Sequence, residues 1–508
     1  MRKLISHQEE LDKTPRLGYT PIEDVQLDPY CRDEITKTLR GIQALYLDTS
    51  TRNELFGILE QMGSDQTSKK AGRKGMDLWT IFVLATLRLS CNWDYDKLRS
   101  CFNNHRSIRE MAGVDMFWDF DKLTGRQTIH DNVTLFTEDI ANQVSKLSID
   151  FGHRQLFPGC TELKTRCDSF VFLSNVHFPT DYNLLLDSVR KVLSICVGTA
   201  KKLDLSGWRE HQSSWNKFRN GYNKLSKMRN SNSPKEVVKD KRRQEILHQV
   251  QVYLTMASKH LEKARDLQAS LDEEIPELET FMDYGELFID QITRRILHDQ
   301  KIPPKEKVYS IFEPYTEWIC KGKAGVRQEL GVKLCIVEDQ YGFILQHQIM
   351  NQKQDKDIAV ELSEKSLTAF PNISSMSFDK GFHSKKDPDG NNNRTLIEAM
   401  GIKAHLPIKG KRNKADTLRE CSEEFGKARK QHPAVESAVN ALESHGLDRC
   451  PDRGEDRYNR YAAVAICSSN IHNIGTILMK REINRKKQIS WRQRQNPDLK
   501  NNSNSKLT

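Results

Sequence analysis

The chain has 508 residues, of which 37% are hydrophobic and 29% charged, and its formal net charge is +10. This length exceeds one ordinary domain and predicts two to four structural units. No run approaches 18 apolar residues and the N-terminus lacks the apolar stretch of a signal peptide, so we expect a soluble, cytoplasmic protein without a membrane span. The eleven cysteines include no CxxC pair, which argues against a zinc ribbon and fits a reducing compartment.

The N-terminal part of the chain predicts a group of short helices. Residues 1–67 form an extension of mixed polarity and weak periodicity. Within 68–150, apolar residues in the stretch 79–90 repeat at helical spacing, and further short helical stretches follow. This pattern is compatible with a helix-turn-helix-like DNA-binding region, and a plain helical bundle is the alternative. The basic residues proposed to contact DNA here are Arg73, Lys74 and Arg126.

Strand signals begin near residue 163. The stretch LKTRCDSFVFL predicts a strand, and a helix follows it, both within the segment 160–200. Residues 201–305 are charged and mostly helical. Their apolar residues between positions 246 and 264 step by three and four, as in a helical hairpin or a short coiled coil. We interpret 201–305 as a helical insertion that serves dimerisation or DNA contact, and the sequence leaves both roles open.

The segment 306–480 changes to alternating strands and helices. GVKLCIVEDQYGFILQHQIM predicts two strands joined by a turn at 339–342. A helix at 357–369, a short strand ending in Asp379, a helix, another strand and two helices follow. Together with the strand and helix of 160–200, this order predicts an α/β domain with a mixed sheet.

A basic tail ends the chain. From Lys480 onward there are nine Lys or Arg residues and two acids. We expect the segment 481–508 to be polar and disordered at its end. Such a tail suits nonspecific contact with nucleic-acid phosphates, and a solvated tail that only aids solubility is the alternative.

Three acids are placed where they could meet above this sheet. Asp168 lies inside the first strand, Asp379 at the end of a later strand, and Glu436 on the helix after the sheet. Converging carboxylates suit Mg²⁺, and a pair of such ions catalyses phosphoryl transfer. From spacing alone the signal is weak, because 69 acids allow many triplets. The ordinary explanations are that Asp168 is an exposed strand residue and that Asp379 forms a turn with Gly381.

Four segments strengthen this interpretation by their order along the chain. They are CDSFVFLSNVHFPTDYNLLLDSVR, YSIFEPYTEWICKGKAGVRQELGVKLCIVEDQYGFIL, FDKGFHSK, and HPAVESAVNALESHGLDRCPDRG with RYAAVAICSSNIHNIG after it. In this order they resemble the first-aspartate, central, second-aspartate and glutamate blocks of the DDE transposases of bacterial insertion sequences. The likeness is to the broad group around insertion sequences four and five and their less classified relatives. It spans roughly 68–200 and 305–480.

The resemblance implies an RNase H-like catalytic domain in which Asp168, Asp379 and Glu436 bind two Mg²⁺ or Mn²⁺ ions. It implies a transposase that cuts DNA at element ends with water and joins the 3′-hydroxyl to target DNA. The implied partners are terminal inverted repeats, target DNA and further copies of the chain in a dimer or higher assembly on paired ends, in the nucleoid. Glu436 matches the family's Val-Glu-Ser step, and Glu443 is the alternative third acid.

Two departures from the family pattern limit what can be transferred. Position 443 is Glu where some relatives have the Lys of a Tyr-Arg-Glu-Lys signature, so the DNA-end contacts of that signature are not carried over. The 57 residues from Asp379 to Glu436 leave no room for a hairpin-handling subdomain.

Further basic residues and two other functions complete the sequence-based hypothesis. The remaining candidate phosphate contacts are Lys321, Lys323, Lys380, Lys409, Lys411 and Arg412. A transposase-derived DNA-binding protein without catalysis is one alternative function. A structure-specific nuclease on the same fold is the other.

Overall fold

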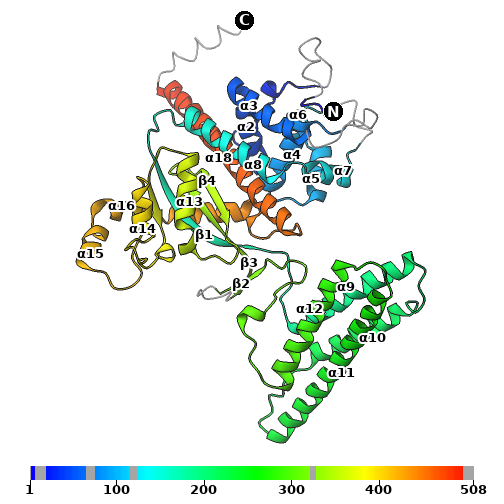
Figure 1. Ribbon diagram of the computed structural model, residues 1–508. Coiled ribbons are helices and arrows are strands. Elements are labelled where there is room, and N and C mark those ends of the chain that lie inside the picture. Colours follow the sequence, from blue (N-terminus) through cyan, green and yellow to red (C-terminus); the bar gives the residue numbers. More distant parts are fainter. Residues whose placement is uncertain (1, 6–18, 64–74, 115–122, 321–327, 496–508) are drawn as a thin grey trace. The chain divides into compact units, whose positions relative to one another are not determined.

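The computed structural model describes residues 2–5, 19–63, 75–114, 123–320 and 328–495 (Figure 1). The chain forms two compact units. We call residues 1–175 with 331–508 the core unit and residues 176–330 the helical unit. The fold is mixed α/β, as the sequence predicts. Four of the predicted DNA contacts lie outside the described residues, namely Arg73, Lys74, Lys321 and Lys323.

Seven α-helices form the N-terminal part of the core unit. They are α2 (Glu34–Leu47), α3 (Thr49–Glu60), α4 (Leu78–Ser90), α5 (Tyr95–Asn104), α6 (Arg106–Met111), α7 (Arg126–Val133) and α8 (Glu138–Phe151). Side chains that accept a hydrogen bond from the first turn cap α2, α3, α5 and α8; these are Asp33, Asp48, Asp94 and Thr137. Helices α2 and α3 correct the sequence analysis, which treated residues 1–67 as a weakly periodic extension.

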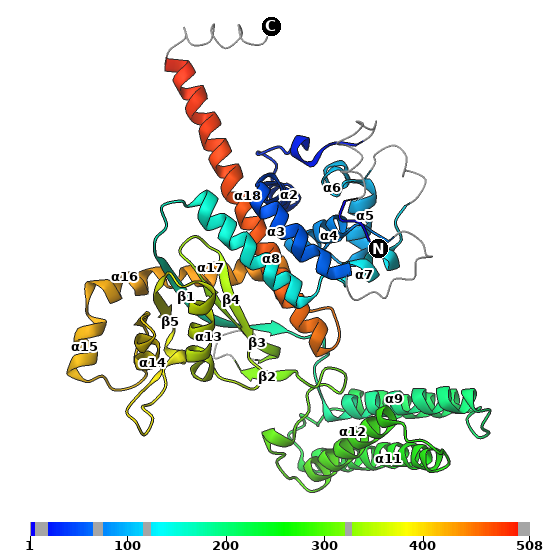
Figure 2. The same cartoon turned by 45° about the horizontal axis from the view of Figure 1, so that its top comes forward.

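Helix α18 (Glu455–Gln495) runs through the core unit (Figure 2). It packs against α2, α4 and α8. The stretch 455–492 is long and apolar enough to cross a membrane, but 67% of its most apolar window is buried inside the protein, as in a core helix. The helix continues through Gln495, so residues 481–495 of the basic tail are helical, and the end of the tail, which the sequence analysis expected to be disordered, lies outside the described residues. A salt bridge from Glu482 to Lys486, one turn apart, supports this extension.

A mixed sheet joins the two halves of the core-unit sequence. Its strands are β1 (Leu163–Leu173), β2 (Glu317–Cys320), β3 (Gln328–Glu338), β4 (Ile344–Ile349), β5 (Ile373–Phe378) and β6 (Lys403–His405). Of these, β2 and the first residues of β3 fall in the sequence range of the helical unit. The order is β2-β3-β1-β5-β6, with β4 also paired to β3. Strands β1, β3 and β4 pair antiparallel, whereas β5 and β6 run parallel to β1. The parallel strands require crossovers, which α13 (Asp355–Ala369) and α14 (Asn393–Ala399) provide.

Three further helices follow the last strand. They are α15 (Lys414–Glu420), α16 (Glu423–Gln431) and α17 (Ala434–Leu442). A short π-helical turn, Glu443–Leu447, continues α17 and contains Gly446 at φ +94°. Because a side chain is strained at such a φ, a glycine suits the end of this helix.

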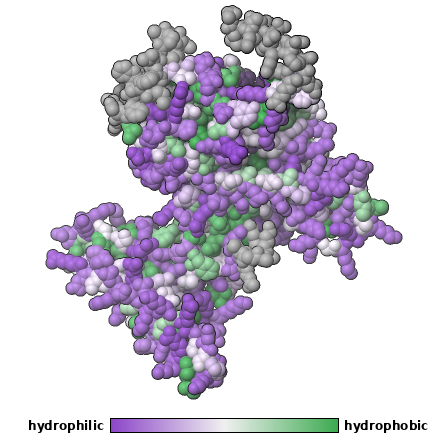
Figure 3. All heavy atoms as spheres, turned by 180° about the vertical axis from the view of Figure 1, so that it is seen from behind, coloured by the Kyte–Doolittle hydropathy of each residue, from purple (hydrophilic) through white to green (hydrophobic). Residues whose placement is uncertain are grey.

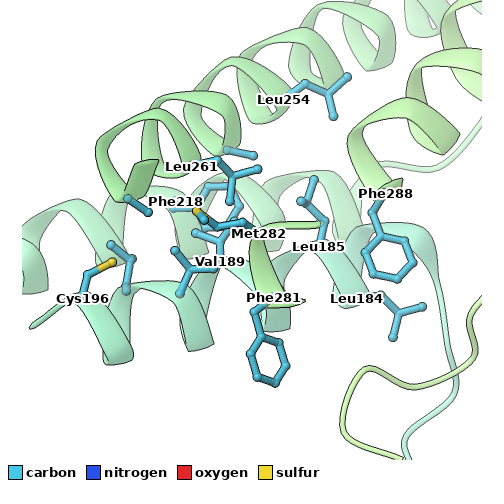
Figure 4. Packing of buried hydrophobic residues seen from close by; sticks show 14 of the residues in the cluster. Leu184, Leu185, Val189, Cys196, Phe218, Leu254, Leu261, Phe281, Met282 and Phe288 are labelled. Atoms are coloured by element: carbon cyan, nitrogen blue, oxygen red, sulfur yellow. The ribbon is translucent and has the colours of Figure 1, made fainter. Parts of the chain in front are cut away.

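The helical unit has its own hydrophobic core. Helices α9 (Asp181–Lys202), α10 (His211–Lys227), α11 (Glu236–Ala269) and α12 (Pro276–Ile292) pack on one another. Leu185 and Val189 of α9, Phe218 of α10 and Leu261 of α11 point into this core (Figure 4). Because α9 buries its apolar side here, it belongs to this unit rather than to the catalytic domain, where the sequence analysis placed it with 160–200.

Candidate active site

Two of the three predicted acids lie on neighbouring parallel strands. Cys167 of β1 pairs in register with Phe378 of β5. Asp168 directly follows Cys167, and Asp379 directly follows Phe378. Paired strands lie about 4.8 Å apart, and residues at the same register position face the same side of a sheet. The sheet therefore brings Asp168 and Asp379 to one face. Asp168 is half-buried, whereas 58% of the Asp379 side chain is exposed.

Backbone hydrogen bonds hold the third acid's helix against the same strand. Leu173, the last residue of β1, donates its N–H to the carbonyl oxygen of Asp448 at 3.2 Å. The N–H of Cys450 donates to the carbonyl oxygen of Leu173 at 2.8 Å. These bonds fix the segment after α17 to the end of β1, and α17 itself contacts β1. Glu436 lies in the first turn of α17 and is exposed.

The start of α17 is also tied to β5. Ser377 Oγ and His432 Nδ1 form a hydrogen bond of 3.0 Å. Arg429 donates to the carbonyl oxygen of Phe378 at 2.8 Å, and its guanidinium lies 3.7 Å from the carboxylate of Asp379. These contacts set the position of α17 relative to both acid-bearing strands.

The acids share one electrostatic environment. The pKa of Asp168 is raised to about 6, chiefly by burial and in smaller part by the negative charges of Asp379, Asp355 and Glu436. A 2.8 Å hydrogen bond from the N–H of Ser169 to the Asp168 carboxylate lowers the pKa, but it does not offset the burial. These carboxylates come from a strand (Asp168), a strand end (Asp379) and two helices (Asp355 and Glu436).

A fourth acid, Asp355, was missed by the sequence analysis. It is the first residue of α13 and accepts a hydrogen bond from Ser169 Oγ at 2.6 Å. It also pairs with Lys333 Nζ at 3.1 Å. A Cβ on Gly381 would lie 3.0 Å from the Asp355 carboxylate, so the turn after Asp379 passes close to this ion pair. The sequence did contain one indication of this acid. Lys333 lies in the apolar strand GVKLCIVE, and a charge in such a strand needs an acidic partner.

Asp355 supports the site from the other side of the sheet. Successive side chains of a strand point to opposite faces, so Ser169 faces away from Asp168. Asp355 accepts a hydrogen bond from Ser169 and lies next to the turn at Gly381. It therefore stabilises both the strand that carries Asp168 and the turn that follows Asp379. Its side chain is 19% exposed and pairs with Lys333, so it is much less open to solvent than Asp379 and Glu436.

A polar hollow continues the sheet face that carries Asp168. Arg166 and Ser377 pair in register two residues before Asp168 and Asp379, and Ser377 pairs with His405 of β6. These residues line a hollow of about 190 Å³ beside α16. A sheet face buried by a helix is normally apolar, so a polar and hollowed face next to the acids suits a polar ligand.

The described basic candidates are distributed over several places. Lys380 follows Asp379 directly and is exposed. Lys409, Lys411 and Arg412 lie exposed between β6 and α15, where Arg412 pairs with Glu420 at 3.1 Å. Arg126 begins α7 and pairs with Asp96 at 3.2 Å, among the N-terminal helices.

The donor set fits a hard divalent cation by its chemistry. Among the described residues, no group of three or more His, Cys, Asp or Glu side chains is close enough to hold a metal ion. Asp168, Asp379 and Glu436 offer oxygen atoms only, which Mg²⁺ and Mn²⁺ prefer. A bound cation would offset the repulsion that raises the pKa of Asp168.

Comparisons with protein-family models, with curated proteins and with solved structures find no match to this chain. The fold and the site are therefore interpreted from the residues themselves. The likeness to DDE transposases stays a prediction that rests on the quoted segments.

The pKa of Asp168 gives a prediction for the metal-free protein. Because its folded pKa of about 6 is above the unfolded value, folding favours the protonated acid. Stability is therefore lost as pH rises from about 4 to about 6, by at most roughly 3 kcal/mol and by less where solvent screens the charge. Asp168→Asn should remove this loss and raise the free energy of unfolding at pH 7 by about 1–2 kcal/mol. Thermal melts with a chelator at pH 5 and pH 7 measure it.

Added metal provides the control for this prediction. Mg²⁺ or Mn²⁺ should stabilise the wild-type protein, by about 2.7 kcal/mol at a hundred times the dissociation constant. The same ions should stabilise Asp168→Asn much less, because a ligand is gone. An Asp168→Asn protein that is equally stabilised by metal would show that Asp168 is not a ligand.

Proposed function

We propose that this protein is a DDE-type transposase that cleaves and rejoins DNA with the acids Asp168, Asp379 and Glu436. The observation that carries the proposal is that Asp168 and Asp379 share one sheet face and that the charges of Asp379 and Glu436 both raise the pKa of Asp168. The strand order β2-β3-β1-β5-β6, with β4 also paired to β3, is antiparallel on one side of β1 and parallel on the other, which supports an RNase H-like fold.

The exposure of the acids suits a large substrate. Asp379 and Glu436 are open to solvent, so a phosphodiester of a DNA strand can reach them without entering a closed pocket. Asp168 is held by the Ser169 N–H and by burial, which fixes one carboxylate while the other two adapt. Lys380, next to Asp379, would offset the charge of a bound phosphate.

The proposed cofactor is a pair of Mg²⁺ or Mn²⁺ ions held by the three acids. When bound, such ions activate a water or 3′-hydroxyl and stabilise the leaving oxygen in phosphoryl transfer. The chain supplies the fixed carboxylates, the polar hollow beside them and nearby cations that orient the strand. In a transposase, two copies of this chain would act on paired element ends.

Incubation of the purified chain with DNA from the end of its genetic element tests the proposal. We expect nicks with 3′-hydroxyl ends that depend on Mg²⁺ or Mn²⁺, followed by strands joined to target DNA. Cleavage without joined products would favour a structure-specific nuclease on the same fold. Binding without cleavage under both metals would favour a transposase-derived DNA-binding protein and would overturn the catalytic proposal.

A further inference from the structure

Charge is separated along the helical unit. The stretch 217–243 has ten Lys or Arg residues and two acids, whereas 272–290 has eight acids and no Lys or Arg. The basic stretch surrounds the α10–α11 connection, and the acidic stretch follows the C-terminal end of α11. A helix of 34 residues is about 50 Å long, so the two connections at the ends of α11 are far apart.

The basic end is exposed and largely unpaired. We define the basic tip as Lys224, Lys227, Arg229, Lys235, Lys241 and Arg243, all of which are exposed. Within the part of the chain that the structure describes, none of these six forms an ion pair. Two further cations there are paired, Lys239 with Glu236 at 3.0 Å and Arg242 with Glu245 at 2.8 Å. These six exposed cations are therefore available to contact an anionic partner.

Core packing does not explain this end of α11. No residue between positions 236 and 248 is buried, and the buried side of the helix begins at Gln249 and Val250. These 13 residues form about 20 Å of helix without a buried side chain. The stretch 224–243 has eight Lys or Arg residues and two acids, and this excess of exposed positive charge favours binding of an anionic partner. Figure 3 shows that the visible surface of the protein is mostly hydrophilic.

A hollow lies at the same end. It has a volume of about 480 Å³ and is lined by residues of the α10–α11 connection, the start of α11 and the segment after α12. Arg243 and Lys239 of α11 and Arg295 lie around it. Three acids, Glu236, Asp240 and Asp299, also line this hollow, so the excess positive charge of this end lies in the exposed cations of the basic tip.

We propose that the basic tip binds the phosphate backbone of duplex DNA, so that the helical insertion is a DNA-holding arm. The choice of DNA as the polyanion rests on the proposed function; the need for an anionic partner rests on the tip alone. About 20 Å of helix spans roughly six base pairs of a duplex. This assigns DNA contact to the insertion, for which the sequence left dimerisation and DNA contact open. Binding here is expected to be independent of DNA sequence, because cations that contact phosphates do not distinguish bases.

A charge-neutralised tip tests the proposal in the full-length chain. The tip variant combines Lys235→Gln, Lys241→Gln and Arg243→Gln, because Gln keeps helix propensity and removes charge. The control variant removes the same charge from the other half of α11 with Lys259→Gln, Lys263→Gln and Arg265→Gln. Both are compared with the wild-type chain by fluorescence anisotropy on a random 30-base-pair duplex, with chelator present so that no cleavage occurs.

The slope of log affinity against log salt concentration is the decisive readout. Each lost phosphate contact should reduce the magnitude of this slope by about 0.9. We therefore expect the slope of the tip variant to be smaller than that of the wild type by about 2.7, and the slope of the control variant to be smaller by less than about 1. Affinity at 100 mM salt should fall at least about tenfold for the tip variant. Equal slopes for the two variants, or an unchanged tip variant, overturn the proposal.

Two further measurements separate the remaining explanations. Circular dichroism and thermal melting confirm that both variants are folded. A tip variant that keeps its DNA affinity but dissociates into smaller oligomers, by light scattering, would assign the tip to the acidic end of a second copy. The salt dependence of binding is measured without metal and does not require cleavage. A wild-type protein that never cleaves DNA would therefore overturn the proposed catalysis, while the test of the basic tip would remain valid.

Discussion

Glu436→Gln is expected to reduce metal-dependent DNA cleavage by about 10³-fold, because a metal ligand that stabilises transition-state charge contributes several kcal/mol. Gln keeps the size of the side chain and removes only the negative charge. Glu436 is exposed in the first turn of α17, so the fold should be unchanged. DNA affinity should be kept or slightly increased, because a negative charge near the phosphates is removed. Cleavage of a labelled element end at saturating protein concentration measures the loss.

Glu443→Gln is the matched control for this prediction. Glu443 begins the π-helical turn after α17 and is half-buried. It lies seven residues beyond Glu436, about 10 Å along a helix axis. We expect its variant to cleave within about threefold of wild type. If Glu443→Gln alone abolished cleavage, the third metal ligand would be Glu443 and not Glu436. If neither variant lost activity, the proposed three-acid site would be wrong.

The strand-borne part of the candidate site could be predicted from the sequence. Asp168 falls inside a run of β-forming residues, and Asp379 ends a short strand just before Gly381, so their places on the sheet follow from local pattern. The register that puts them side by side could not be predicted. It arises from the pairing of β1 with β5, two segments about 210 residues apart.

Long-range packing also explains what the sequence analysis missed. The first helices were taken for an extension, although Ile35, Leu39 and Ile42 repeat at helical spacing and are buried. Helix α2 packs mainly on α18, more than 400 residues away, so most of what buries this stripe is not visible in the local sequence. Asp355 was missed for the same reason, because its partners Lys333 and Ser169 come from other strands.

The contact between α2 and α18 depends on two glycines. A Cβ on Gly41 of α2 would overlap the carbonyl oxygen of Ile471 in α18, and a Cβ on Gly475 would overlap the carbonyl oxygen of Lys37 in α2. The two backbones therefore touch directly, closer than any other residue allows. Helix α18 also donates a hydrogen bond from the Tyr458 hydroxyl to the carbonyl oxygen of Phe172 in β1. The crossing thus positions a helix that supports the strand carrying Asp168.

Gly475→Ala is expected to lower the free energy of unfolding by about 3 kcal/mol, at the upper end of the usual cost of overpacking. The overlap is with backbone atoms of α2, which cannot rotate away as a side chain can, so the helices must separate. Gly41→Ala should have a similar effect for the same reason. Urea unfolding of each variant, followed by tryptophan fluorescence and circular dichroism, measures the change.

Gly57→Ala supplies the opposite expectation with the same chemical change. Gly57 lies inside α3, and a Cβ there would meet nothing within 4 Å. Alanine has the higher helix propensity, so this variant should gain about 0.5–1 kcal/mol. Equal effects at Gly57 and Gly475 would show that the crossing adds no cost of its own. A neutral Gly475→Ala would mean that α2 and α18 are not in direct contact, and the support that α18 gives to β1 would need another origin.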